Sequence, residues 1–199
     1  MAHDEKKLTR LNPQIAMSVL KPDKRIGLVV VLTGYGKGKT SSALGMLMRA
    51  CGHGMKACVL QFMKGDLFTG EWEAVKKIDC DVEIVAGGMG FCGIQGNPYP
   101  HDRHREAAQS TLLMAKERIL SGKYDLIILD EINNAVHLKL VDLEQVIDLI
   151  ESKPPLLHLV LTGRDAAPEV IQRADTVSEV REIAHAWRKG IEPQPGVDF

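Results

Sequence analysis

Short apolar runs alternate along the chain with stretches of helical period. From Gly27 onward, six runs rich in aliphatic and β-branched residues have the length of buried strands. They are Leu28–Thr33, Ala57–Phe62, Val82–Ala86, Leu126–Asp130, Leu157–Thr162 and Thr176–Val180. Strands that are apolar throughout need cover on both faces, which is typical of a parallel sheet enclosed by helices.

Three of the intervening stretches carry apolar residues at, or close to, the i, i+3, i+4, i+7 spacing of one helix face. They are Leu44, Leu47, Met48 and Cys51; Ala108, Leu112, Ala115 and Ile119; and Leu143, Val146, Ile147 and Ile150. We interpret each stripe as a face buried against the sheet. Strands and helices together predict an α/β protein with three layers, α/β/α, around a mostly parallel sheet.

The composition fits one globular domain that binds neither nucleic acid nor a membrane. The 199 residues are 45% apolar, and 25 basic against 26 acidic residues leave a net charge of −1. A duplex-DNA binder carries a basic excess, and a membrane span needs about 20 apolar residues, far more than the run Gly27–Leu32. The charged start of the chain is unlike an export signal, and the four cysteines form no C-x-x-C pair. We therefore expect a soluble cytoplasmic protein with reduced thiols.

Two segments fall outside the regular pattern. Residues 1–25 carry six cations against three anions, a net of +3, and contain Pro13 and Pro22. We expect an N-terminal basic arm, mobile or docked on a partner, ahead of a domain that spans 26–199. Gly87–Pro100 holds five glycines and two prolines in 14 residues, which predicts an irregular loop with a functional role or no fixed structure.

Two histidines, His101 and His104, open the helical stretch after this loop. Their three-residue spacing on a helix would allow both to bind one metal ion. We favour the simpler interpretation, in which both are exposed polar residues that begin the helix.

The segment Gly34–Ser41 (GYGKGKTS) follows the first predicted strand and opens a helical stretch. This is the setting of a P-loop, in which backbone N–H groups and a helix N-terminus bind phosphate. Lys39 would supply a mobile cation, and the hydroxyl of Thr40 or Ser41 is placed to bind Mg²⁺. The loop is atypical, because Thr33 stands where the general pattern has its first glycine, and Tyr35 is bulky. The expected nucleotide-binding residues here are Thr33, Gly34, Gly36, Lys37, Gly38, Lys39, Thr40 and Ser41.

Two carboxylates, Asp130 and Glu131, follow directly on the apolar run of the fourth predicted strand. In open α/β folds, ligands bind at the carboxyl ends of the strands, beside the P-loop. One of the pair can reach Mg²⁺, directly or through water, and Glu131 could either orient an attacking water or bind the metal. Gln61, Lys64 and Arg164 also follow strand ends, and we expect them on the same rim.

The order of these motifs resembles that of the P-loop type of corrinoid adenosyltransferase, over residues 26–199. Besides the loop and Leu129–Glu131, the matching segments are Arg49-Ala50, Gly52–Gly54, Gln61-Phe62, Lys64-Gly65, Gly70-Glu71, Gly90-Phe91, Leu161–Arg164, Ala174–Glu179, His185, Lys189–Ile191 and Gly196-Val197. The resemblance implies a P-loop NTPase-like (RecA-like) fold. It also implies transfer of the 5′-deoxyadenosyl group of ATP to the cobalt of cob(I)alamin or a related corrinoid, with release of triphosphate.

The resemblance implies roles for individual residues at the phosphates. The γ-phosphate would lie where an ATPase holds the α-phosphate, which turns C5′ of the ribose toward the corrinoid. Lys37, Lys39 and the loop amides would stabilise the departing triphosphate. Thr40 and Glu131 would hold Mg²⁺, and Asp130 would orient that set. The further nucleotide-binding residues would be Arg49, Gln61, Lys64 and Arg164.

On the corrinoid side, the resemblance makes Phe91 an apolar wedge. It would remove the lower axial ligand of cobalt and so make Co(II) easier to reduce. Bacterial members of the family commonly have Trp where this chain has Gly93, so Phe91 would act alone or with Ile94 or Tyr99. The expected catalytic residues are Lys39, Phe91 and Glu131. A reductant or flavoprotein electron donor and a second copy of the chain, in a homodimer, are the expected protein partners.

Two other functions fit the same residues. The chain could be a different P-loop enzyme, an ATPase or kinase, in which Glu131 positions water or Asp130 serves phosphoryl transfer. It could also bind ATP and hand a corrinoid to a client protein without turnover. Tyr35, where the family usually has Asn, and Gly93 keep this second alternative open.

Overall fold

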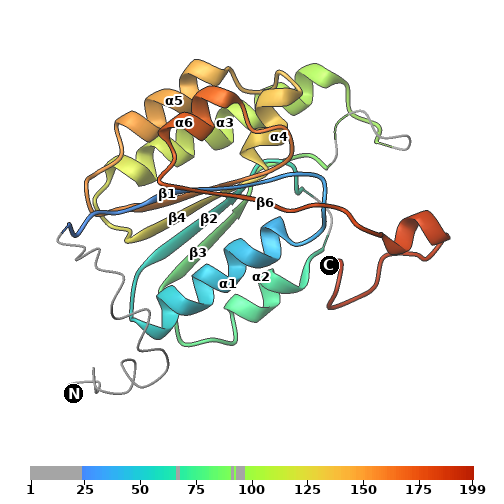
Figure 1. The fold of residues 1–199 in the computed structure, drawn as a ribbon, viewed down its shortest axis with the longest axis horizontal. Helices are drawn as coiled ribbons and strands as arrows, with labels where there is room; N and C mark the ends of the chain where they lie inside the picture. The colour runs from blue at the N-terminus through green and yellow to red at the C-terminus, as the bar shows by residue number, and fades with distance from the viewer. Residues whose placement is uncertain (1–23, 66–67, 91, 93–96) are drawn as a thin grey trace, which may run out of the picture.

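The computed structural model describes residues 24–65, 68–90, 92 and 97–199. Within them, six strands form one sheet in the order β3-β2-β4-β5-β1-β6, and every neighbouring pair is parallel (Figure 1). The strands are β1 (Val29–Thr33), β2 (Ala57–Gln61), β3 (Val82–Ala86), β4 (Leu126–Asp130), β5 (His158–Thr162) and β6 (Thr176–Glu179). All six predicted strands are confirmed, and each end lies within one residue of its predicted position.

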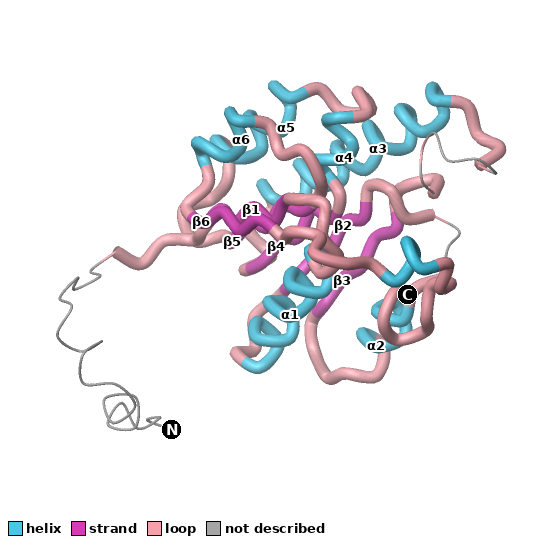
Figure 2. Tube along the Cα trace, turned by 45° about the vertical axis from the view of Figure 1, so that its right-hand side comes forward, coloured by secondary structure: helices cyan, strands magenta, loops and turns pink. Residues whose placement is uncertain are grey.

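Helices cover both faces of the sheet, which confirms the three-layer α/β architecture (Figures 1 and 2). On one face lie α1 (Lys39–Gly52) and α2 (Gly70–Val75). On the other lie α3 (His101–Leu120), α4 (Ile132–His137), α5 (Leu143–Glu151) and α6 (Pro168–Arg173). After β6 the chain runs out to a 3-10 helix, η2 (Ala186–Lys189). No helix in the described part of the chain has the length and apolar character of a bilayer span.

The sheet divides the core into two apolar clusters. Along β1, Val29 and Val31 belong to the cluster on the α3–α6 side, whereas Val30 and Leu32 belong to the cluster on the α1 side. Successive strand residues point to opposite faces, so an apolar strand fits only where both faces are covered. The apolar strand pattern of the sequence therefore has a direct structural cause.

The predicted stripe on α1 was only partly correct. Leu47 is buried, but Met48 is 57% exposed, and the helix packs on the sheet through Ala43, Leu47 and Ala50. Small alanine side chains let the helix approach the sheet closely. Leu44 is half-buried against the apolar cluster on the α1 side, and Leu44 and Met48 both line a cavity. The stripe of α3 is buried throughout, and that of α5 is buried at Val146 and Ile150 and half-buried at its other two positions.

The prediction that His104 is exposed was wrong. Its side chain is 3% exposed, because α3 begins at His101 and carries His104 to the same inner face as Ala108. The ring of Tyr99 meets the imidazole edge-on, with 6.3 Å between centroids. Burial lowers the pKa of His104, which favours the neutral form of the ring.

A cluster of polar side chains lies near the amino ends of the strands, on the α3 side of the sheet. The Glu83 carboxylate accepts two hydrogen bonds from the Arg118 guanidinium, at 2.6 and 3.2 Å, and one from the Tyr124 hydroxyl. The Cys58 thiol lies 3.9 Å from the same carboxylate. The Arg118 hydrogen bonds lower the pKa of Glu83, and the bond to Glu83 raises the pKa of Tyr124 to about 12. We call these four residues the Glu83 cluster.

Candidate active site

The phosphate loop has a backbone that glycine makes possible. Gly34 and Gly38 have φ angles of +95° and +123°, where other residues are strained. A Cβ at Gly34 would also lie 2.5 Å from the carbonyl oxygen of Val180. The Gly36 N–H donates to that same oxygen at 2.7 Å, so the chain after β6 supports the loop from behind. The loop is thus shaped both by its own sequence and by a segment far along the chain.

Polar side chains form a row across the carboxyl ends of three neighbouring strands. Gln61 of β2 and Asp130 of β4 are register partners, and Thr162 ends β5. Asp130 Oδ1 accepts hydrogen bonds from the hydroxyls of Thr40 and Thr162, each at 2.8 Å. Because the Thr40 hydroxyl uses its proton on Asp130, its oxygen lone pairs remain available to a cation. The row joins the first turn of α1 to the end of the sheet.

Glu131 occupies an unusual backbone position at the start of α4. Its φ of 64° is in the left-handed region, and its N–H donates to the Thr162 hydroxyl at 2.8 Å. Glu131 Oε2 is buried and has no hydrogen-bond partner within the described residues. Burial, followed by the neighbouring Asp130 charge, raises the pKa of Glu131 to about 7. A buried carboxylate oxygen without a donor has the electrostatic character of a site for a cation.

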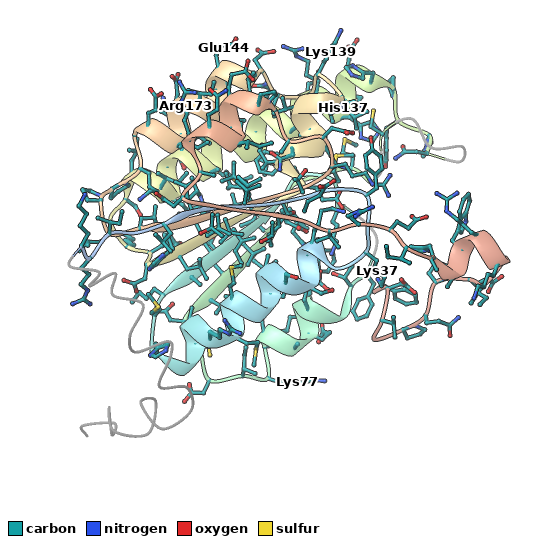
Figure 3. All side chains as sticks on the ribbon, in the orientation of Figure 1. Lys37, Lys77, His137, Lys139, Glu144 and Arg173 are labelled. Atoms are coloured by element: carbon teal, nitrogen blue, oxygen red, sulfur yellow. The ribbon has the colours of Figure 1, made fainter. Side chains whose placement is uncertain are left out.

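A cavity of about 580 Å³ lies in front of the phosphate loop. Its lining residues are Lys37–Ser41, Leu44, Gly45, Met48, Lys64, Gly70, Glu71, Glu131 and Gly196–Phe199. Lys39 Nζ donates to the Gly36 carbonyl at 2.9 Å, and burial, with the nearby Arg164 charge, lowers the pKa of Lys39. Lys37 Nζ forms an ion pair with Asp198 at 2.7 Å, and residues near the C-terminus thereby line the cavity. Figure 3 shows Lys37 beside the C-terminal segment. The cavity combines backbone donors, cations and carboxylates, as a bound triphosphate and metal require.

Helix α2 contributes a second set of polar groups to this cavity. Lys64 Nζ lies 2.5 Å from Glu71 Oε1, and both side chains are largely buried. Gln61 Nε2 donates to the same Glu71 oxygen at 3.1 Å and to Asp130 Oδ2 at 3.4 Å. The Trp72 indole N–H donates to Gln61 Oε1 at 2.7 Å. The amide of Gln61 therefore links α2 to the row of strand-end residues.

Tyr35 stands between two further cavities beside the loop. Its hydroxyl donates to Asp165 Oδ1 at 2.7 Å, and the Arg164 guanidinium lies 5.5 Å from its ring centroid. One cavity, of about 460 Å³, is lined by Tyr35, Arg164, Glu182, His185, Trp187 and Arg188. The other, of about 330 Å³, is lined by Tyr35, Met63, Cys92, Asn134, His137, Leu138, Arg164 and Asp165.

The structure brings most of the predicted site residues together. Thr40, Asp130 and Glu131 meet at the carboxyl end of β4, and Lys37, Gly38, Lys39, Ser41 and Lys64 line the same cavity. Thr33, Gly34 and Gly36 form the entry to the loop, where the Thr33 hydroxyl accepts a hydrogen bond from Ala166 N–H at 3.3 Å. Phe91, Gly93 and Ile94 lie outside the described residues.

Three predicted binding residues do not line the phosphate cavity. Gln61 was expected on the rim, but its side chain is completely buried and contacts protein groups, because β2 is covered by α2 at this point. Arg164 borders the two cavities at Tyr35 instead of the phosphate cavity. Arg49 is exposed in the last turn of α1, about 15 Å along the helix from Lys39. The resemblance identified these residues, but it could not give their side-chain directions.

Sequence reasoning did not assign a role to Thr162, Trp72 or Asp198. Thr162 could have been found, because it ends a predicted strand next to Gly163-Arg164. Glu71 was in a matching segment but was given no function. No local pattern in the sequence points to Trp72 or Asp198, whose partners are remote in the chain or are set by tertiary packing.

Known proteins are similar to this chain along most of its length. The chain matches the family described as ATP:corrinoid adenosyltransferase BtuR/CobO/CobP over residues 25–199. A corrinoid adenosyltransferase of Pseudomonas aeruginosa is 38% identical over 175 residues, which cover 87% of this chain and 84% of that protein. A corrinoid adenosyltransferase of a Sinorhizobium species is 39% identical over 183 residues, which cover 90% of this chain and 83% of that protein. One of Escherichia coli is 30% identical over 190 residues, which cover 96% of this chain and 94% of that protein. The phosphate loop, the strand-end carboxylates and this similarity along nearly the whole chain lead to one conclusion: the protein belongs to the ATP:corrinoid adenosyltransferase family BtuR/CobO/CobP.

Proposed function

We propose that the protein transfers the 5′-deoxyadenosyl group of ATP to the cobalt of a reduced corrinoid, as its family membership indicates. The observation that carries the proposal is the single cavity that joins the phosphate loop to Glu131 and Lys64. Co(I) attacks C5′ of the ribose. The cobalt–carbon bond forms as the C5′–O bond breaks, and the electron pair of that bond leaves with triphosphate.

The chain's own residues would act mainly on the leaving group. The loop N–H groups and Lys39 would stabilise the charge that develops on triphosphate as the C5′–O bond breaks. Co(I) is a strong nucleophile without deprotonation, so no general base is required. We propose that the nucleotide lies with its γ-phosphate at the helix end of the loop and its ribose toward Tyr35 and Arg164, whose cavities adjoin the loop.

Mg²⁺ is the metal that these residues would hold. The candidate ligands are hard oxygen donors: the Thr40 hydroxyl, whose lone pairs are available, and Glu131 Oε2, which is buried and receives no hydrogen bond from the described residues. Asp130, already fixed by two hydroxyls, would orient the Thr40 ligand. When bound with the nucleotide, Mg²⁺ would neutralise part of the triphosphate charge.

The corrinoid would meet the protein beside Tyr35. Cys92 lines the cavity of about 330 Å³ there, and it is the neighbour in sequence of Phe91, the proposed apolar wedge on cobalt. A reductant or flavoprotein would supply the electron for Co(II). We also propose a cytoplasmic homodimer, in which the basic segment 1–25 could cover the partner's site.

The reaction products test this function. The protein is incubated with MgATP, cob(II)alamin and a strong chemical reductant, and the products are separated. Adenosylcobalamin and tripolyphosphate in equal amounts are expected. ADP and orthophosphate without adenosylcobalamin would instead identify an ATPase, and ligand binding without any product would favour a delivery protein.

The wedge is tested by comparing two starting states of cobalt. Phe91→Ala should slow the reaction that starts from cob(II)alamin far more than the reaction that starts from chemically prepared cob(I)alamin, because only the first includes the difficult reduction. Equal losses in the two assays would contradict the role of Phe91.

A further inference from the structure

The Gln61 amide is buried, and each of its polar atoms has a partner. Its two N–H bonds point to Glu71 Oε1 and Asp130 Oδ2, at 3.1 and 3.4 Å, and its oxygen accepts from Trp72 at 2.7 Å. An amide makes at most two donations and two acceptances, so the donor side is fully used. No part of this side chain reaches the phosphate cavity, which Glu71 and Lys64 do line.

Trp72 determines which way the amide points. An indole N–H can only donate, so the Gln61 oxygen must face Trp72 and the nitrogen must face the two carboxylates. The opposite orientation would set the Gln61 oxygen against two carboxylates and its NH₂ group against another donor. A buried polar network of this kind is stable only when each donor meets an acceptor.

The amide therefore sits between two carboxylates with different neighbours. Asp130 also accepts from Thr40, the proposed metal ligand, and Glu71 is paired with Lys64 in the cavity. A neutral donor shared by both carboxylates holds the two side chains in place, which a carboxylate or an empty space at the same position would not do.

We propose that Gln61 and Trp72 are positioning residues for the metal-dependent part of triphosphate binding, with the Trp72 indole fixing the Gln61 amide that orients Asp130 and Glu71. This rests on the proposed function, in which a triphosphate and Mg²⁺ occupy the cavity. The loop amides and Lys39 bind the anion by themselves. Gln61 contacts the carboxylates of Asp130 and Glu71 and not the phosphate loop. Its loss should therefore affect the gain in affinity that the metal provides.

The test measures the affinity for inorganic tripolyphosphate by calorimetry, once with Mg²⁺ and once with EDTA. Wild type should bind more tightly with Mg²⁺, and the ratio of the two affinities is the metal-dependent gain. Gln61→Glu, which removes the donor and adds a third carboxylate, should reduce that gain by about tenfold or more, with little change in EDTA. Trp72→Phe, which keeps a ring but removes the N–H, should reduce it by a smaller factor.

A second readout is optical. The chain has two tryptophans, so in a Trp187→Phe background the emission comes from Trp72 alone. Trp187 is 72% exposed and lies outside the phosphate cavity. Emission should change when tripolyphosphate and Mg²⁺ are added together, and Gln61→Glu in the same background should remove that change.

Gln109→Glu is the matched control. Gln109 is also a hydrogen-bonded amide, on α3, where it donates to Leu140 O and pairs with Gln145. This substitution should lower the thermal unfolding midpoint but leave the metal-dependent gain intact. If Gln61→Glu does not fold, the metal-dependent gain of Trp72→Phe tests the positioning role by itself.

The outcomes separate the two proposals. If wild type shows a metal-dependent gain and both Gln61→Glu and Trp72→Phe keep it, the positioning role is wrong and the proposed function stands. If wild type binds no tripolyphosphate in either buffer, the proposed function fails and the positioning role fails with it.

Discussion

Two carboxylate clusters lie at opposite ends of the same sheet and are held in opposite ways. In the Glu83 cluster, a guanidinium, a phenol and a thiol surround one carboxylate, and its pKa is lowered. At the other end, Asp130 is held by neutral hydroxyls and an amide. Glu131 has an oxygen with no hydrogen-bond partner in the described part of the chain, and its pKa is raised to about 7.

The difference in partners distinguishes a carboxylate that stabilises the fold from one that can bind a cation. A carboxylate paired with its own cation gains its stabilisation in the folded protein and has little to offer an incoming charge. A buried pair without a full counter-charge costs stability until a cation arrives. Four substitutions test this contrast, from the largest expected effect to the smallest.

The largest effect is expected for Lys39→Ala, which removes the Lys39 ammonium from the phosphate loop. Turnover and tripolyphosphate affinity should each fall by about a hundredfold, because this ammonium stabilises the triphosphate charge. Product formation and calorimetry measure the two. Lys56→Ala is the control, since Lys56 makes an exposed ion pair with Asp81 at the other end of the sheet. Wild-type affinity in Lys39→Ala would show that the triphosphate binds elsewhere.

Glu131→Gln should stabilise the metal-free protein while weakening metal-dependent binding. The folded pKa of about 7 lies above the ordinary value near 4.3, so the folded state binds more protons between these limits. Wild-type stability should therefore fall as pH rises through this window, and the variant should lack that slope. At about pH 8 the variant should be more stable by about 1–3 kcal/mol.

The measurement for Glu131→Gln is urea unfolding in EDTA at several pH values. Glu144→Gln on α5, an exposed carboxylate, serves as the control and should change neither stability nor its pH dependence by much. A variant less stable than wild type at high pH would mean that Glu131 is already neutralised in the free protein.

Glu83→Gln should change the stability of the protein in the opposite direction, by lowering it. The lowered pKa of Glu83 means that the folded state holds fewer protons, so its stabilisation is present above the ordinary glutamate pKa and is lost as pH falls through the folded value. The variant should be less stable by about 1 kcal/mol at neutral pH, since the ion pair is partly solvated. The gap to wild type should close in acid, and a gap independent of pH would contradict the assigned cause.

The smallest effect is expected for Tyr124→Phe, which removes one of the donors to Glu83 and keeps the ring. A loss of about 0.5–1 kcal/mol in the free energy of unfolding is expected, since Arg118 still holds the carboxylate. A loss larger than that of Glu83→Gln would show that the hydroxyl has a further structural role.

The sequence predicted the elements of this fold better than the directions of individual side chains. Strand ends were correct within one residue because fully apolar runs bounded by turns have few alternatives. The phosphate loop and Asp130-Glu131 were found because they follow such strands directly. The carboxyl ends of parallel strands meet at one edge, so the topology alone brought these residues together.

The errors arose where packing decides the outcome. Met48 fits a helical stripe as well as Leu47 does, but only close packing of Ala43 and Ala50 on the sheet determines which side is buried. Gln61 is a polar residue at a strand end, and it is inside because α2 covers it. His104 is buried because it lies one turn before Ala108 on the inner face of α3, and that face is covered as far as the first turn of the helix.

The support of the phosphate loop by the chain after β6 has a consequence for how the protein is made. β1 has its two neighbours, β5 and β6, near the other end of the sequence, and the Gly36 N–H finds its acceptor only at Val180. Contacts of such long sequence separation form slowly. During synthesis the nucleotide loop is translated early but gains its supporting contacts only after nearly the whole domain has emerged, so an incomplete chain does not hold the loop in its final form.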